Sequence, residues 1–238
     1  MSQTSPIDTA FDVRSDSGGR DPDQHSATLR RYHQLLWSKP LPDGSPFYLD
    51  SGFPGAYLHH KSQLGEFALA SDTIVHTFAS WPRMAHIIER VSDEDREEFH
   101  RIGRTVGGAI LFPANRVSGK PTINGSRGMH PRIRDRFDLT LECIRRHYTG
   151  DANPLEKTLV RYADFFGLFG SFRGYVDFFL LQDLVIENHS AVRFFTPFAD
   201  FTGSALPGTL EAYEQYRART LAFVAARNVR IAGSVTGE

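Results

Sequence analysis

Basic residues gather in the middle of the chain, where they could hold an anion. Between Arg101 and His147 the sequence has ten arginines and lysines against three acids, Asp135, Asp138 and Glu142. This stretch carries a net charge of +7 while the whole chain carries −1, so the remainder carries about −8. Such a charge asymmetry predicts a local anionic partner.

The most basic part of this stretch is residues 116–136, RVSGKPTINGSRGMHPRIRDR, which join the end of a predicted strand to the start of a predicted helix. Backbone N–H groups at a helix start favour an anion, as does the helix dipole. We therefore expect a phosphate-bearing small molecule, such as a nucleotide, or an RNA strand to bind there. The candidate ligand-binding residues are Arg116, Lys120, Asn124, Arg127, Arg132 and Arg136.

The basic segment lacks the sequence motifs of the common nucleotide-binding loops. It contains neither the GxxxxGK(S/T) loop of nucleoside triphosphate enzymes nor the GxGxxG dinucleotide fingerprint, so no cofactor is predicted. One alternative is a solvated hairpin in which Asn124 and Gly125 form a tight turn and the arginines pair with acids elsewhere. Another is a non-catalytic protein-interaction module whose basic face meets an acidic partner, or the acidic surface of a second copy in a homo-oligomer.

A helix is predicted over residues 131–148, because proline is favoured at the first helical position and apolar residues recur at helical spacing. On its outer face Arg134 precedes Asp138 by one turn and Glu142 precedes Arg146 by one turn, which predicts surface ion pairs. The buried stripe is predicted to contain Ile133, Phe137, Leu141, Ile144 and Tyr148.

Two histidines are candidates for acid–base catalysis if the protein is an enzyme. The chemistry that fits the basic segment is metal-independent phosphodiester cleavage, as in a nuclease, or nucleotide-dependent group transfer. His147 or His130 would then move the proton while arginines hold the phosphate. Alternatively, Arg136 and His147 are structural and pair with a buried acid such as Asp177. The sequence leaves open whether Asp177 and Asp183, both in its most apolar segment, are structural or functional.

Metal and cysteine chemistry are not predicted. His59 and His60 are adjacent on a predicted strand and so point to opposite faces, and the ten histidines show no HExxH, HxH or Cys-His metal spacing. Cys143 lies on a half-buried helix position, where an inert thiol is expected.

We predict one folded domain over residues 26–228, between a disordered tail at 1–25 and a flexible tail at 229–238. The N-terminal segment is polar and acidic, which is typical of disorder. The whole chain has 40% hydrophobic residues and 19 phenylalanines, enough apolar material for the remaining residues to form a core. No linker interrupts the middle of the chain, and 238 residues lie within the range of one hydrophobic core.

Short apolar runs separated by turn residues predict strands between Phe47 and Phe78. Residues 105–113 predict a central strand with a bulge at Gly107 and Gly108, and residues 192–198 predict a late strand. Helices are predicted for most of the second half. This distribution indicates an α+β fold, in which a small mixed or antiparallel sheet from the N-terminal half packs against a helical C-terminal half.

The chain is expected to be cytoplasmic. Its N-terminal segment has no apolar run of the kind a signal peptide needs, and its single cysteine has no partner within the chain. The most apolar segment, residues 175–185, is about half the ~20 residues of a membrane span and contains acids, so no membrane association is predicted.

Four segments carry a resemblance to a known family: GGAILFPANRV, KPTINGSRG, RFDLTLECIRRHY and GYVDFFLLQDLV. At these segments the chain resembles a bacterial family of unknown function, found in actinobacterial and related genomes. The resemblance extends from about His25 to Phe201 and implies a bacterial, cytoplasmic, single-domain protein. It implies no activity, and no residue acquires a role from it.

Overall fold

The computed structural model describes residues 6–53 and 55–235. Helices in its first half are α1 Pro22–His25, α2 Ala27–Trp37, α3 Ala85–Ile88 and α4 Asp93–Gly103. Those of the second half are α5 Ile123–Met129, α6 Phe137–Thr149, α7 Glu156–Leu159, α8 Ala163–Gly167, α9 Phe172–Phe178 and α10 Leu210–Ser234.

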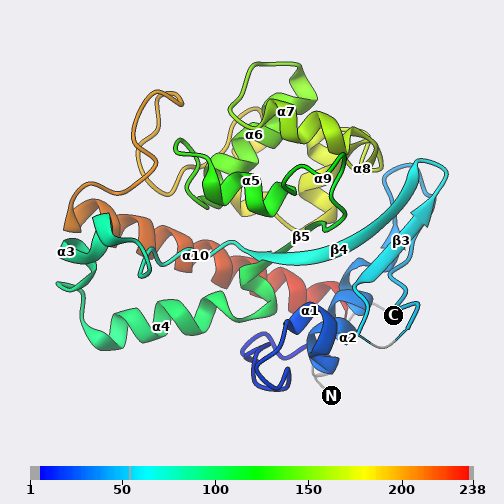
Figure 1. The fold of residues 1–238 in the computed structure, drawn as a ribbon, viewed down its shortest axis with the longest axis horizontal. Helices are drawn as coiled ribbons and strands as arrows, with labels where there is room; N and C mark the ends of the chain where they lie inside the picture. Colours follow the sequence, from blue (N-terminus) through cyan, green and yellow to red (C-terminus); the bar gives the residue numbers. More distant parts are fainter. Residues whose placement is uncertain (1–5, 54, 236–238) are drawn as a thin grey trace.

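Two small antiparallel sheets lie in the first half of the chain. The hairpin of β1 Lys39–Pro40 and β2 Pro46–Phe47 forms one. The other has the order β3-β4-β5, with β3 Leu58–Ser62, β4 Gly65–Thr73 and β5 Ala109–Pro113. The predicted α+β class is confirmed, because these sheets pack against the helices of the second half (Figure 1). The central strand is β4, whereas β5, which was expected to be central, lies at the sheet edge.

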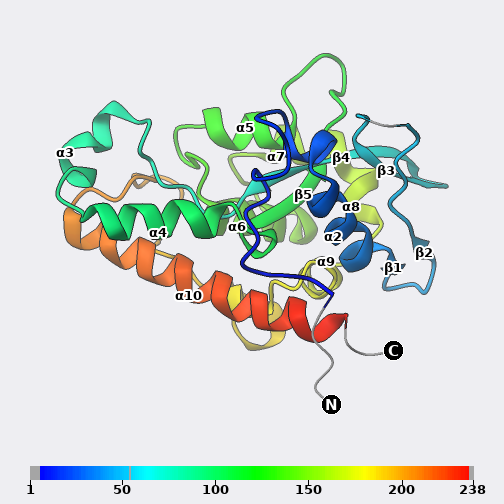
Figure 2. The same ribbon diagram turned by 90° about the horizontal axis from the view of Figure 1, so that it is seen from below.

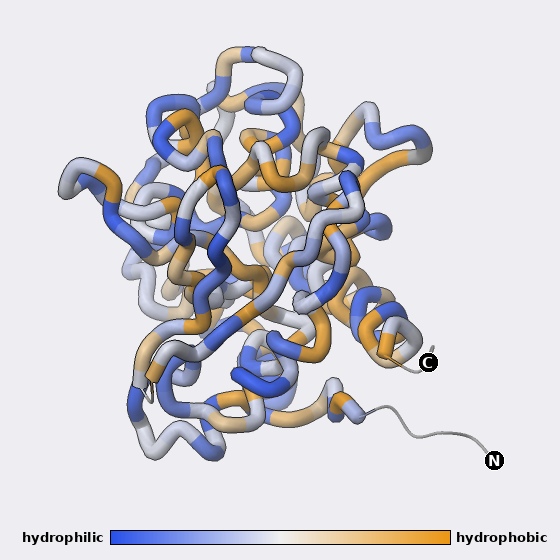
Figure 3. Tube along the Cα trace, turned by 90° about the vertical axis from the view of Figure 1, so that its right-hand side faces the viewer, coloured by the Kyte–Doolittle hydropathy of each residue, from blue (hydrophilic) through white to orange (hydrophobic). Residues whose placement is uncertain are grey.

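One hydrophobic core connects the sheet to both groups of helices. Figures 1 and 2 show α5 to α9 gathered on one side of β4 and β5, while α10 runs lengthwise beside α4 on the other. Phe112 of β5, Phe137 of α6 and Val224 of α10 are all fully buried within it. Figure 3 shows apolar stretches of the chain passing through the interior, with many hydrophilic turns at the periphery.

The glycine pair before β5 permits close packing rather than forming a strand bulge. Val106–Gly108 is a 3-10 turn, and the strand begins only at Ala109. A Cβ on Gly107 would overlap the side-chain amide of Asn228 in α10, and one on Gly108 would lie 2.6 Å from the carbonyl oxygen of Ile102. Both glycines therefore allow neighbouring elements to approach more closely than a side chain would permit.

Other elements also differ from those predicted. Residues 131–135 form a turn and α6 starts at Phe137, because Arg134 and Asp135 adopt left-handed φ values of 51° and 59°. The expected loop before them contains α5, whose cap residue Thr122 accepts a hydrogen bond from the Gly125 N–H. The late strand predicted at 192–198 is replaced in the structure by a single bridge between Val185 and Val192.

Residues 6–25 pack on the body, in contrast to the tail expected from their composition. Ile7 and Val13 are buried, and the Val13 N–H donates to the carbonyl oxygen of Arg104 at 2.9 Å. Together with Phe11, which packs against the core from a partly buried position, these side chains suffice because the body supplies the rest of the packing surface. At the other end, α10 continues to Ser234 with Ile231 fully buried, so most of the expected C-terminal tail is helical. Residues 1–5 and 236–238 lie outside the described residues.

Deleting residues 1–20 should lower the free energy of unfolding by about 3 kcal/mol, because Ile7 and Val13 leave the core. Urea denaturation of the truncated and full chains measures this difference. Deleting residues 1–5 alone is the control, and an equal stability of all three chains would show that residues 6–20 contribute nothing.

Candidate functional site

Arg127, a predicted ligand residue, is fully buried in a network of protein acceptors. Its guanidinium donates to Asp72 Oδ2 at 2.6 Å, to Thr140 Oγ1 at 3.0 Å and to the Asp135 carbonyl oxygen at 2.6 Å. The carboxylate of Asp135 is 3.7 Å away. Burial removes water from this cation, so the two carboxylates are required partners rather than surface neighbours. Arg127 therefore ties β4 to the turn before α6.

Arg136 and Asp138 form a buried ion pair with the two side chains 3% and 0% exposed. Arg136 also donates to the Ala205 carbonyl oxygen at 3.2 Å, and Asp138 accepts from the Phe195 N–H at 2.9 Å. The predicted surface pair between Arg134 and Asp138 is thus wrong. The helix was predicted to begin at residue 131, but α6 begins at Phe137. Asp138 therefore lies in the first turn of α6 and faces inward.

The remaining acids of interest are paired with neighbouring cations. Glu142 accepts hydrogen bonds from Arg145 and, as predicted, from Arg146, but it is buried rather than on an open face. Asp183 accepts from two nitrogens of Arg230 at 2.6 and 2.9 Å, and these hydrogen bonds lower its pKa. Asp177 lies 3.5 Å from Arg173, one turn away, and 3.7 Å from His189 rather than beside Arg136 or His147.

The other predicted residues are spread over separate places. Arg116 and Lys120 are exposed on the loop before α5. Asn124 lies in α5, where its amide donates to the Ser71 carbonyl oxygen at 3.4 Å. His147 lies against the ring of Phe166 at 5.3 Å, and burial lowers its pKa. Cys143 is buried, and burial raises the pKa of its thiol, as expected for an inert residue.

A surface depression of about 560 Å³ contains two of the predicted residues, His130 and Arg132, together with Arg146. The Arg132 side chain is exposed, and among the described residues no carboxylate lies within 4.0 Å of its guanidinium. Arg146 lies over the ring of Phe201 at 4.9 Å and is already paired with Glu142. Asp200 lies beyond 4.0 Å but is close enough for the charge of Arg132 to act on it, so Arg132 supplies exposed positive charge to this depression without a direct ion pair.

His130 adds a hydrogen-bond donor to the same depression. Its Nδ1 accepts from the backbone N–H of Arg132 at 3.2 Å, which leaves Nε2 to carry the proton of the neutral ring. Burial and the guanidinium groups of Arg132 and Arg134 lower its pKa. The ring is consequently neutral at neutral pH and would gain a proton more readily beside a bound anion.

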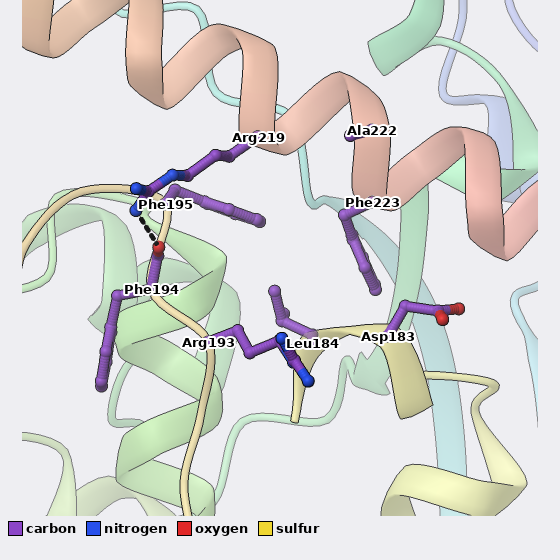
Figure 4. A pocket seen from close by; sticks show the side chains of 8 residues that line it. All are labelled: Asp183, Leu184, Arg193, Phe194, Phe195, Arg219, Ala222 and Phe223. Atoms are coloured by element: carbon purple, nitrogen blue, oxygen red, sulfur yellow. Dashed lines mark hydrogen bonds between the residues drawn. The ribbon is translucent and has the colours of Figure 1, made fainter. Parts of the chain in front are cut away.

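A second pocket, of about 480 Å³, lies outside the basic segment and is lined by none of the predicted catalytic or ligand-binding residues, although it includes Asp183 (Figure 4). It is formed between α10 and residues 183–195 and contains Arg193 and Arg219 beside buried apolar side chains. The two arginines are 26 positions apart and occur outside the basic stretch. No local pattern in the sequence indicates that they meet.

A half-buried serine, a buried histidine and a buried aspartate also meet near the N-terminal segment. Ser71 Oγ donates to Asp23 Oδ1 at 2.6 Å and lies 2.8 Å from His33 Nε2. The Trp37 indole donates to His33 Nδ1 at 3.2 Å, so the proton of the neutral imidazole is on Nε2. His33 then donates to Ser71 instead of accepting its proton, which is the reverse of the order in a serine nucleophile. This network fastens residues 21–25 to β4.

The buried His33 and the half-buried His76 predict a loss of stability in mild acid. Burial lowers the pKa of His33 to about 3, and burial with the charge of Arg127 lowers that of His76 to about 4. The unfolded chain therefore binds more protons than the folded chain below pH ~6.5. Each of the two histidines should lower the free energy of unfolding by about 2 kcal/mol between pH 7 and pH 5.

Burial of Asp23 acts in the opposite direction, because it raises the pKa of that carboxyl to about 6. As the pH falls, the Asp23 carboxyl takes up its proton in the folded chain before it does so in the unfolded chain. This uptake should raise the free energy of unfolding by about 1 kcal/mol by pH 5. Urea unfolding at both pH values measures the net loss. The variant His76→Gln should lose less on acidification than the natural chain, and an unchanged loss would contradict the assignment to His76.

Comparison with protein-family models matches residues 7–231 to a family of unknown function, DUF6994. The chain belongs to this family. The match begins at Ile7 and reaches Ile231, so it includes the packed N-terminal segment and nearly all of α10. The predicted resemblance to a family of unknown function is thereby confirmed, while its bacterial origin stays a prediction. No curated protein and no solved structure matched the chain.

Among the residues that the structure describes, no group of three or more histidine, cysteine, aspartate or glutamate residues is placed to hold a metal ion. None of the helices in this part of the chain combines the length and apolar character needed to cross a membrane.

Proposed function

We propose that the protein binds a phosphate-bearing ligand, a nucleotide or the end of an RNA strand, in the depression lined by His130, Arg132 and Arg146. The observation that supports this proposal is the unpaired, exposed guanidinium of Arg132 beside the Nε2 donor of His130. An arginine fork and an N–H donor together match the oxygens of a phosphate group.

Other groups in the depression favour a nucleotide over free phosphate. Glu156 and Asn153 also line it, and their oxygens accept hydrogen bonds from hydroxyl or amino groups of a sugar or base. A carboxylate would weaken the binding of an isolated phosphate, so its presence favours a ligand that extends beyond the phosphate. Arg127 and Arg136 have no part in this site, because buried carboxyl and carbonyl groups already occupy their donors.

Calorimetric titration with nucleoside monophosphates and a short RNA, at low and moderate salt, tests the proposal. Arg132→Gln should weaken binding about tenfold or more, because it removes a charged hydrogen-bonding partner. Arg116→Gln is the matched control, since it removes the same charge from the neighbouring exposed loop. Equal weakening by both variants would indicate diffuse electrostatic attraction and exclude this depression as the site.

The same titration carried out at several pH values reports on His130. Because a bound phosphate raises the pKa that burial and the nearby arginines lower, affinity should increase as the pH falls below neutral. His130→Gln should keep a donor and lose most of this pH dependence. If none of the ligands binds the natural chain, the non-catalytic interaction module becomes the preferred function.

A further inference from the structure

The pocket beside α10 combines an apolar floor with positive charge. Figure 4 shows Leu184, Phe195 and Phe223 facing its interior, and their side chains are 2%, 1% and 5% exposed. The volume of about 480 Å³ is within the range of small-molecule sites, which are mostly apolar with a few placed polar groups. Little of these three side chains is accessible, so a ring-sized apolar group would lie across their edges and against the exposed Ala222 and the half-buried Phe194.

Arg219 is held at one side of this pocket with donors to spare. It extends from α10, and its Nη1 donates to the carbonyl oxygen of Phe194 at 3.0 Å (Figure 4). No carboxylate in the described part of the chain lies within 4.0 Å of its guanidinium. One hydrogen bond thus fixes the direction of the side chain, while its remaining N–H groups and its charge are unmatched.

Arg193 adds a second cation from the facing segment. Its Nε donates to the Val185 carbonyl oxygen at 3.0 Å, and it has no carboxylate partner within 4.0 Å among the side chains that the structure describes, which do not include that of Glu187. The nearby acid is Asp183, whose carboxylate is bound by Arg230 and is directed away from the middle of the pocket (Figure 4). The described charged side chains that line the pocket, two arginines and one aspartate, therefore carry a net positive charge.

We propose that this pocket binds an aromatic carboxylate, with the carboxylate on the guanidinium of Arg219 and the ring across the accessible edge of Phe223 and the exposed Ala222 of α10. A carboxylate can accept two parallel hydrogen bonds from the planar guanidinium of an arginine. These hydrogen bonds become stronger as the ligand excludes water from the pocket. Aromatic rings gain additional energy from offset or edge contacts with phenylalanine beyond the area they bury. Because one face is apolar and the rim is cationic, the site selects against neutral polar ligands and against cations.

This site is independent of the phosphate site, because the two pockets share no lining residue. Either proposal can fail without the other. An aryl phosphate could also use the arginines, so the probe series has to distinguish carboxylate from phosphate.

Calorimetric titration with 2-naphthoate, 2-naphthamide and 2-naphthyl phosphate tests the proposal. The natural chain should bind the carboxylate about tenfold or more tightly than the amide, which has the same ring without charge. Arg219→Gln should remove that preference, and Ala222→Trp, which fills the pocket from α10, should abolish binding. Arg132→Gln should leave naphthoate affinity unchanged.

Three results would overturn the proposal. They are equal affinity for the carboxylate and the amide, unchanged affinity in Ala222→Trp, and tighter binding of the aryl phosphate than of the carboxylate. Circular dichroism of each variant verifies folding, and a second pocket-filling change, Ala222→Phe, replaces the tryptophan variant if that chain does not fold.

Discussion

Replacing Arg127 with methionine is expected to lower the free energy of unfolding by about 3 to 5 kcal/mol. The change removes the guanidinium that neutralises Asp72 and Asp135 in a partly buried site and leaves the hydroxyl of Thr140 without this donor. Leaving charges without a partner costs more than the ion pair itself contributes, because their solvation was lost on folding. Urea denaturation at pH 7 measures the effect.

Arg132→Met is the matched control for this prediction. Arg132 lies five positions later in the same basic segment, but it is exposed and unpaired, so its replacement should change stability by less than about 0.5 kcal/mol. Similar losses in both variants would mean that the basic segment acts as a whole. A loss confined to Arg127 would establish that one predicted ligand residue is instead a structural cation.

Replacing Arg227 with methionine should have an effect of comparable size, at least about 3 kcal/mol. This arginine of α10 is fully buried and has no carboxylate within 4.0 Å among the described residues. Its guanidinium donates to the carbonyl oxygens of Phe179, Gly107 and Ala109, and burial lowers its pKa to about 9. Three buried carbonyl groups would lose their donor in the variant.

The control for Arg227 lies on the next turn of the same helix. Arg230 is an exposed residue paired with Asp183, so Arg230→Met should cost less than about 1 kcal/mol. Arg227→Lys separates charge from geometry, because an ammonium group keeps the charge but cannot reach all three carbonyl oxygens. If the lysine variant is as stable as the natural chain, the carbonyl contacts contribute little.

Both predictions concern contacts that join segments far apart in the chain. Arg127 connects α5 to β4, and Arg227 connects α10 to residues 107–109 and to the end of α9. The basic stretch concentrates positive charge in the sequence. Which of its arginines face solvent depended on where the compensating acids lie, and Asp72 is outside that stretch.

The sequence by itself determined several local elements and the fold class. Ser26, Ser92 and Ser171 are of a residue type that favours helix starts, and in the structure each accepts a hydrogen bond from an N–H three residues later. Short apolar runs and turn residues predicted strands between Phe47 and Phe78, the part of the chain that contains β3 and β4. These features depend on interactions within a few residues, so a single sequence contains the information that specifies them.

Only the tertiary structure decided which residues line the two pockets. Packing turned Asp138 inward beside Arg136, placed Gly107 against Asn228, and brought Ile7 into the core. It also separated His147 from His130 and joined Arg193 to Arg219 across one pocket. Each outcome depends on the distance between segments that are remote in sequence. Charge, burial and hydrogen bonding at those distances are fixed only when the whole core assembles, and local residue patterns do not encode them.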